Sequence, residues 1–133
     1  MKHASVERLY VATLSLLSVH QIDAAYWHEW DMFALPGGIQ LFDLSNLALL
    51  PWLLLGFRAV VLGRPSGYLW SLVMGALGVV TAVIHTGFAA AGFRQFGLPV
   101  STGLIGLCAL SGLAQIVVTL RHRDAFGAED VRR

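Results

Sequence analysis

Four apolar stretches, each about twenty residues long, constrain the fold of this 133-residue chain more than any other feature. They cover approximately residues 9–27, 39–57, 67–92 and 101–120. A helix needs roughly 20 residues to cross the hydrocarbon layer of a bilayer. A soluble domain this short could not bury so much apolar surface, because its ratio of surface to volume is too high. We therefore predict an all-α integral membrane protein, built as a bundle of four transmembrane helices.

Composition and charge agree with this class and argue against others. Hydrophobic residues make up 56% of the chain and charged residues only 13%, against about 25% charged residues in typical soluble domains. The net charge of +1 creates no long-range field that would attract nucleic acid, so no such partner is expected. Lys2 and Arg8 precede the first apolar stretch as in a signal peptide, but no Ala-x-Ala-like cleavage site follows, and we expect this segment to remain as a helix.

The connections and their charges indicate the orientation. Glycine and proline at 36–38, 63–67 and 97–99 are turn signals between the stretches. With four spans, one side of the membrane carries eight of the nine Lys and Arg residues, and the other side carries only Arg94. Basic residues collect on the cytoplasmic side. We predict an N-in/C-in protein of the bacterial inner membrane, with residues 121–133 as a polar cytoplasmic tail.

Ionisable side chains within three of the stretches are the main indication of function, because such groups are costly in a bilayer. His20 and Asp23 lie near the outer end of the first stretch, Asp43 and Asn46 in the first turns of the second, and His85 in the outer part of the third. At a rise of about 1.5 Å per residue, all of them lie at similar depth. In a compact bundle they would face one another in the outer half of the membrane.

One interpretation of this cluster is an acid/base enzyme with His20, Asp23, Asp43 and His85 as catalytic residues and Asn46 as an orienting group. An Asp–His pair can act as a general acid and base. The substrate would be a lipid-like or isoprenoid-like apolar molecule that arrives through the bilayer. Isomerisation, cyclisation and hydrolysis are all compatible with this chemistry.

A second interpretation is a metal or haem site, for which the candidate ligands are His20, Asp23, His28, Glu29 and His85. Imidazole and carboxylate groups suit zinc, iron and copper. Their spacing matches no established ligand motif, so neither the presence nor the identity of a cofactor follows from it. A third interpretation is structural: the buried polar groups only hold the helices together, and His28, Glu29 and Asp31 form a solvated loop.

Aromatic residues mark the expected outer interface. Tyr26, Trp27 and Trp30 lie where the first stretch should leave the outer leaflet, and amphipathic rings favour such interfaces. Together with Asn46 they are the predicted binding residues, and the predicted partners are membrane lipids and an apolar small molecule. Glycine pairs at 75/78 and 103/106 favour close helix packing, within the chain, in a homo-oligomer, or as an accessory subunit of a larger membrane complex.

The segment from His20 to Phe33, HQIDAAYWHEWDMF, with LPGGIQ after it, resembles a signature of small bacterial four-span membrane proteins of unknown function. The resemblance implies the four-span fold over most of the chain and implies no activity. The His and acidic residues near an outer opening are also similar in style to emopamil-binding, sterol isomerase-like membrane proteins, which use His and Glu in a helical cavity. Here the acids are Asp23 and Asp43, and the spacing differs.

Overall fold

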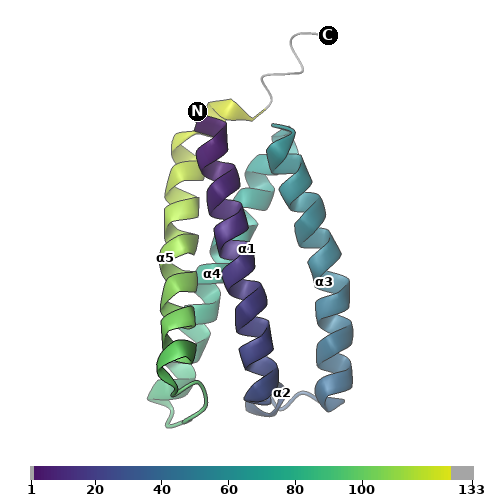
Figure 1. The fold of residues 1–133 in the computed structure, drawn as a ribbon, viewed down its shortest axis with the longest axis vertical. Coiled ribbons are helices and arrows are strands. Elements are labelled where there is room, and N and C mark those ends of the chain that lie inside the picture. Colours follow the sequence, from purple (N-terminus) through teal and green to yellow (C-terminus); the bar gives the residue numbers. More distant parts are fainter. Residues whose placement is uncertain (1, 127–133) are drawn as a thin grey trace.

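The computed structural model describes residues 2–126, which form only helices and connecting turns. Four long helices run up and down the molecule, and the start of the first lies at the same end as the finish of the last (Figure 1). The predicted all-α class is confirmed. In chain order the elements are α1 (Lys2–Tyr26), α2 (Glu29–Met32), α3 (Gly38–Val61), α4 (Pro65–Ala90), α5 (Pro99–Arg121) and the 3-10 turn η1 (Arg123–Ala125).

Three of the described helices, α3, α4 and α5, are long and apolar enough to cross a membrane. The helix α1 has sufficient length, but it is not among the three. His20, Gln21 and Asp23 interrupt its apolar sequence in the last two turns. Of the four predicted spans, three are thus apolar enough to cross a membrane, and α1, whose outer end is polar, is not, although it packs against the other long helices.

Proline and glycine define the ends of the long helices. α4 and α5 each begin with a proline at the first helical position, preceded by an extended residue. This position suits proline because its missing N–H has no partner within the helix. α3 follows Gly37, whose φ of 92° is accessible to glycine at little cost, and α3 continues without interruption through Pro51.

Glycine also brings α4 and α5 into close contact. A Cβ added at Gly78 would lie 2.5 Å from the carbonyl oxygen of Cys108, and one added at Gly112 would collide with the carbonyl oxygen of Gly75. Small residues of this kind let helix backbones approach closely in membranes. Gly103 and Gly106 differ, because a Cβ at either would meet no atom of the described chain within 4 Å.

Buried hydrogen bonds join the helices at the end where α1 begins. Tyr10 on α1 donates its hydroxyl to the carbonyl oxygen of Leu53 on α3 at 2.7 Å. Gln115 on α5 donates to the carbonyl oxygen of Ser71 on α4 at 3.1 Å. At the same end, Arg123 of η1 lies over the ring of Tyr68, 5.7 Å from its centroid. The predicted tail at 121–133 starts at the end of α5, and its residues 127–133 lie outside the described part of the chain.

The segment between α1 and α3 folds back as the short helix α2. Two residues with left-handed backbone, His28 and Ala34, flank this helix. Its residue Met32 is buried in one cluster with Ala24 of α1 and Phe96 of the α4–α5 connection. This segment is therefore more than a solvated loop, and it contributes a side chain to the site described next.

Candidate metal site

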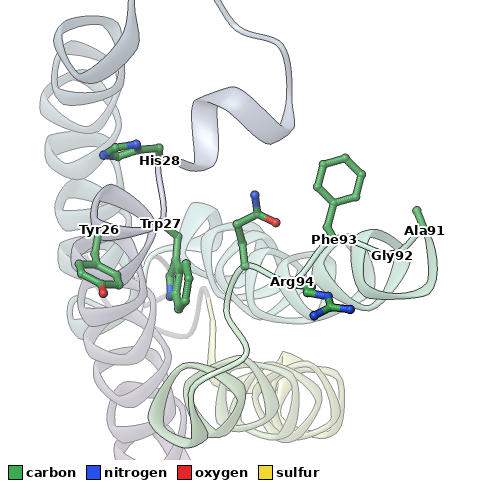
Figure 2. A pocket seen from close by; sticks show the side chains of 8 residues that line it. Tyr26, Trp27, His28, Ala91, Gly92, Phe93 and Arg94 are labelled. Carbon is green, nitrogen blue, oxygen red and sulfur yellow. The ribbon is translucent and has the colours of Figure 1, made fainter.

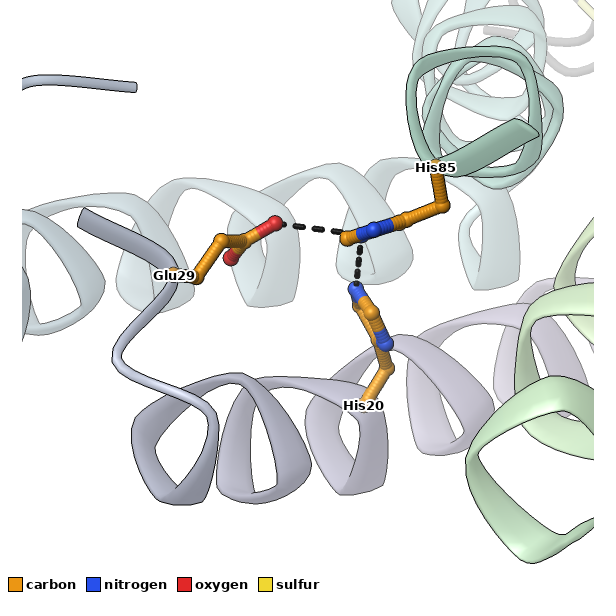
Figure 3. A group of neighbouring side chains, drawn as sticks. All are labelled: His20, Glu29 and His85. Atoms are coloured by element: carbon orange, nitrogen blue, oxygen red, sulfur yellow. Dashed lines mark hydrogen bonds and ion pairs between the residues drawn. The ribbon is translucent and has the colours of Figure 1, made fainter. Parts of the chain in front are cut away.

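Two histidine side chains meet in the interior, near the end of the bundle that carries α2. His20 of α1 and His85 of α4 are 1% and 6% exposed. Their Nε2 atoms lie 3.1 Å apart, and the rings are nearly perpendicular, with 4.8 Å between centroids. Figure 3 shows both imidazoles with their Nε2 atoms turned toward each other.

Glu29 completes a group of three potential ligands. Its Oε1 atom lies 3.1 Å from Nε2 of His85, and its side chain is 12% exposed. The chain reverses at His28, whose φ is 53°, so that Glu29 at the start of α2 turns back toward the bundle (Figure 3). One ligand atom from each of His20, Glu29 and His85 lies within 4.8 Å of the other two.

The protons available to this group do not satisfy all of its contacts. Nε2 of His85 faces both Nε2 of His20 and the carboxylate of Glu29. In a neutral imidazole, Nε2 carries either a proton or a lone pair, so this atom of His85 cannot donate to one neighbour and accept from the other at the same time. A cation bound between the two imidazoles and the carboxylate of Glu29 would interact favourably with the lone pairs of all three groups.

Phe96 covers both imidazoles. Its ring centroid lies 4.2 Å from that of His85 and 5.4 Å from that of His20, and the residue is 4% exposed. Its φ of 61° is uncommon for a bulky residue. A hydrogen bond of 3.0 Å from the hydroxyl of Thr102 to the carbonyl oxygen of Phe96 holds this conformation. An apolar ring in this place excludes water and strengthens electrostatic interactions in the site.

Asp23 takes part in a separate polar group. Its Oδ1 accepts a hydrogen bond of 3.0 Å from the hydroxyl of Ser101, the third residue of α5. The indole N–H of Trp27 donates to the same hydroxyl oxygen at 3.2 Å. The structure therefore connects Asp23 to α5, and Asp23 does not belong to the group that His20 forms with Glu29 and His85.

Asp43 and Asn46 also lie away from the two histidines. Both line a cavity between α1, α3 and α4. The side-chain amide of Asn46 donates to the carbonyl oxygen of Phe42 on its own helix at 2.9 Å. The expected convergence of all five polar residues on one point is thus not observed, because Asp43 and Asn46 of α3 line this cavity instead.

The remaining predicted residues lie at the surface of this end of the molecule. His28 is exposed, 4.0 Å from the carboxylate of Asp31, and its ring stacks on that of Trp30. Tyr26 is 69% exposed. Figure 2 shows Tyr26, Trp27 and His28 around an open pocket that the α4–α5 connection borders with Arg94. His28 therefore does not contribute to the buried ligand group.

Two residues of the site were not foreseen from the sequence. Phe96 and Ser101 are neither ionisable nor part of a motif, and nothing in the sequence indicates the direction of their side chains. The turn signal at 97–99 lies between Phe96, in the α4–α5 connection, and Ser101, in the first turn of α5. That signal predicts a chain reversal after the helix that carries His85, but it does not predict which side chains Phe96 and Ser101 contact.

Comparison with known proteins places the chain in a family. The profile of a family of unknown function, DUF6713, matches residues 6–122. The chain therefore belongs to this family, which confirms the resemblance to a family without an assigned activity. Neither the curated proteins nor the solved structures gave a match.

Proposed function

We propose that this member of the DUF6713 family binds a divalent transition-metal ion through His20, Glu29 and His85. The observation that carries the proposal is the convergence of their three ligand atoms within 4.8 Å from three separate helices. Two histidines and one carboxylate are a ligand set typical of catalytic zinc and of non-haem iron. Both imidazoles are buried, so solvent is not available to them as an alternative partner, and this favours binding of an ion.

The spacing of the ligand atoms supports the same proposal. Nitrogen and oxygen ligands bind zinc at about 2.0–2.1 Å, which places neighbouring ligands on one ion roughly 3 Å apart. The separation of the two Nε2 atoms is 3.1 Å, and that from Nε2 of His85 to Oε1 of Glu29 is also 3.1 Å. Two of the three ligand pairs thus have the spacing of neighbouring ligands on one ion, and the third pair, His20 and Glu29, lies within 4.8 Å.

Three protein ligands leave a coordination position for water or substrate, as in catalytic sites rather than closed structural ones. Glu29 also lines a cavity of about 230 Å³ between α2 and the start of α3. This cavity gives the ligand group a route to the outside of the bundle. The proposal is therefore an enzyme-type centre, in which the bound ion would supply Lewis-acid or redox chemistry.

A second candidate function needs no metal. The contact of 3.1 Å between Glu29 and His85 is a carboxylate–imidazole pair, which can act as a general acid and base. The residues of this pair differ from the Asp–His pairs expected from the sequence, because Asp23 and Asp43 point elsewhere. Metal binding and acid/base catalysis predict different results in the experiment below.

We place the centre in a four-span bundle with both termini in the cytoplasm of a bacterial cell. Three apolar helices support membrane insertion, and the excess of basic residues supports the orientation. The helix α1 packs against these three helices, and its polar residues Thr13 and His20 are buried against protein rather than lipid. This packing supports α1 as the fourth span.

The test is a zinc titration of the full-length protein, purified in detergent and treated with a chelator. One equivalent of Zn²⁺ is expected to bind. We expect His20→Ala, His85→Ala and Glu29→Gln each to weaken binding more than about 100-fold, since loss of an outer-shell partner alone typically costs about 10–100-fold. His28→Asn and Asp31→Asn are matched controls, because both residues are exposed neighbours of Glu29 and asparagine adopts the left-handed backbone of residue 28 readily. Both variants should bind as tightly as the wild type.

Equal affinity in the ligand variants and the controls would show that the zinc binds elsewhere, and the metal proposal would be wrong. Absence of stoichiometric binding in the folded wild-type protein would also contradict it. The carboxylate–imidazole pair would then be the remaining candidate.

A further inference from the structure

A cleft with one polar end separates α1 from α3. The cavity has a volume of about 580 Å³, within the range of roughly 300–1,000 Å³ that small-molecule sites occupy. Toward the end opposite α2, the hydrogen bond from Tyr10 of α1 to the carbonyl oxygen of Leu53 joins the two helices. The walls are polar near α2 and made of leucine further along, with Gln21, Asp43 and Asn46 at the polar end and Leu14, Leu17 and Leu53 at the apolar end.

The polar end of this cleft leads toward the ligand group. A second cavity, of about 230 Å³, shares Gln21, Phe42 and Asn46 with the cleft and is also lined by Glu29. A molecule that fills the cleft therefore has its polar end next to a carboxylate that belongs to the proposed metal site.

The charges on the walls limit the kind of head group that fits. Asp43 and Glu29 contribute carboxylates, and no Lys or Arg of the described chain lines either cavity. The carboxylate of Asp43 has no hydrogen-bond or ion-pair partner among residues 2–126. Two carboxylates repel an anionic head group, whereas an unpaired carboxylate favours a head group that donates hydrogen bonds.

The cleft is open on one side. Leu47 and Leu50, which line it, are 70% and 44% exposed. Both belong to α3, which is one of the helices apolar enough to cross a membrane. A long apolar molecule can therefore enter sideways from the lipid phase, without passing through water.

We propose that this cleft binds a long-chain alcohol, with the chain along the leucines and the hydroxyl group between Asp43 and Asn46. This inference rests on the proposed function for one of its parts, namely that the hydroxyl end reaches the metal held by Glu29. The site for the chain itself depends only on the cleft. The alcohol donates one hydrogen bond to Asp43 and retains an oxygen lone pair for a cation.

Photo-crosslinking tests the proposal on the full-length protein in detergent after chelator treatment. The probes are hexadecanol and hexadecanoic acid, each with a diazirine in the middle of the chain. We expect saturable labelling of cleft residues on α1 and α3 by the alcohol, with unlabelled hexadecanol as competitor. The acid should require at least about tenfold higher concentration, because the carboxylates in the cleft repel it. Asp43→Asn should reduce this preference.

Two tryptophan variants on the same helix separate the cleft from the general lipid surface. Leu50→Trp fills the cleft and should abolish saturable labelling. Leu55→Trp adds the same ring at a residue that is 56% exposed and lies outside the cleft, so its labelling should match the wild type. Equal labelling of both variants, or labelling spread evenly over all lipid-facing helices, would overturn the proposal whether or not the protein binds metal.

Zinc addition tests the link to the metal site. It should increase the affinity for the alcohol in the wild type and have no effect in His85→Ala. Saturable labelling that zinc leaves unchanged in a protein shown to bind zinc would support the cleft and contradict its connection with the metal. Saturable labelling in a protein that binds no zinc would support the cleft while the proposed metal function fails.

Discussion

Phe96 is an apolar residue whose ring packs against both site histidines. It packs against both imidazoles from a loop and keeps a backbone conformation that is unusual for its size. A site that stores such a conformation is typical of functional regions, where the surrounding structure determines it. The hydroxyl of Thr102 helps to stabilise this backbone conformation by donating a hydrogen bond to the carbonyl oxygen of Phe96.

We expect Phe96→Ala to lower the affinity for zinc by about 10–100-fold, the range found for outer-shell partners. Removal of the ring admits water and frees both imidazoles to change orientation. Phe93→Ala is the matched control, because Phe93 lies in the same loop and is 41% exposed. A zinc titration of the two variants decides the matter, and similar affinities would show that Phe96 has no role in holding the site.

Single residues also show where sequence reasoning reached its limit. His20 and His85 were identified because an ionisable group within an apolar stretch is costly and so stands out. Asp23 and Asp43 were identified for the same reason, but depth along a helix does not specify the direction around it. Glu29 was only one of several candidate ligands, because its position depends on the reversal at His28.

At the scale of helices, the contact of α4 with α5 depends on glycine at a few positions. A Cβ at Gly112 meets backbone atoms of α4, and backbone cannot move aside as a flexible side chain does. We expect Gly112→Ala to reduce the free energy of unfolding by about 1–3 kcal/mol, the usual cost of overpacking. Gly106→Ala, on the same helix in open space, should stabilise the helix by roughly 0.5–1 kcal/mol.

Unfolding of both glycine variants by a denaturing detergent gives these free energies. Equal effects of the two substitutions would contradict the packing of α4 on α5 described above. The glycine pair at 75/78 was predicted to serve helix packing, and it does so within the chain.

The contact of α1 with α3 depends on one buried hydrogen bond, from Tyr10 to the carbonyl oxygen of Leu53. We expect Tyr10→Phe to lower the free energy of unfolding by about 0.5–1.5 kcal/mol, the typical net value of such a bond. Tyr26→Phe is the control, since the Tyr26 side chain is exposed, and it should leave stability unchanged. The same unfolding measurement applies, and an unchanged Tyr10→Phe would mean that this bond does not stabilise the pair.

The ends of the long helices are easier to predict from the sequence than the position of the short helix α2. Proline at the start of α4 and α5 has a fixed conformation that suits the first turn of a helix. No comparable signal precedes α2, where the chain reverses at a histidine with left-handed backbone. Histidine adopts this conformation more often than most residues but still uncommonly, so a histidine in the sequence does not by itself mark a chain reversal.

For the whole molecule, the unequal distribution of basic residues predicts the orientation. In a background with Cys108→Ala, we expect Gln95→Cys to react with a membrane-impermeant maleimide on intact cells, because the α4–α5 connection would face outward. Arg64→Cys, in the α3–α4 connection, should react only after permeabilisation. Labelling of Arg64→Cys on intact cells would contradict the N-in/C-in orientation.

X-ray absorption of the zinc-loaded protein tests whether His20, Glu29 and His85 bind one metal ion. We expect scattering from two imidazole rings and a carboxylate oxygen at about 2.0–2.1 Å. The His85→Ala variant, loaded under the same conditions, should lose one imidazole or the zinc altogether. A spectrum without imidazole ligands, or one that is identical in the variant, would show that these three residues do not bind the ion.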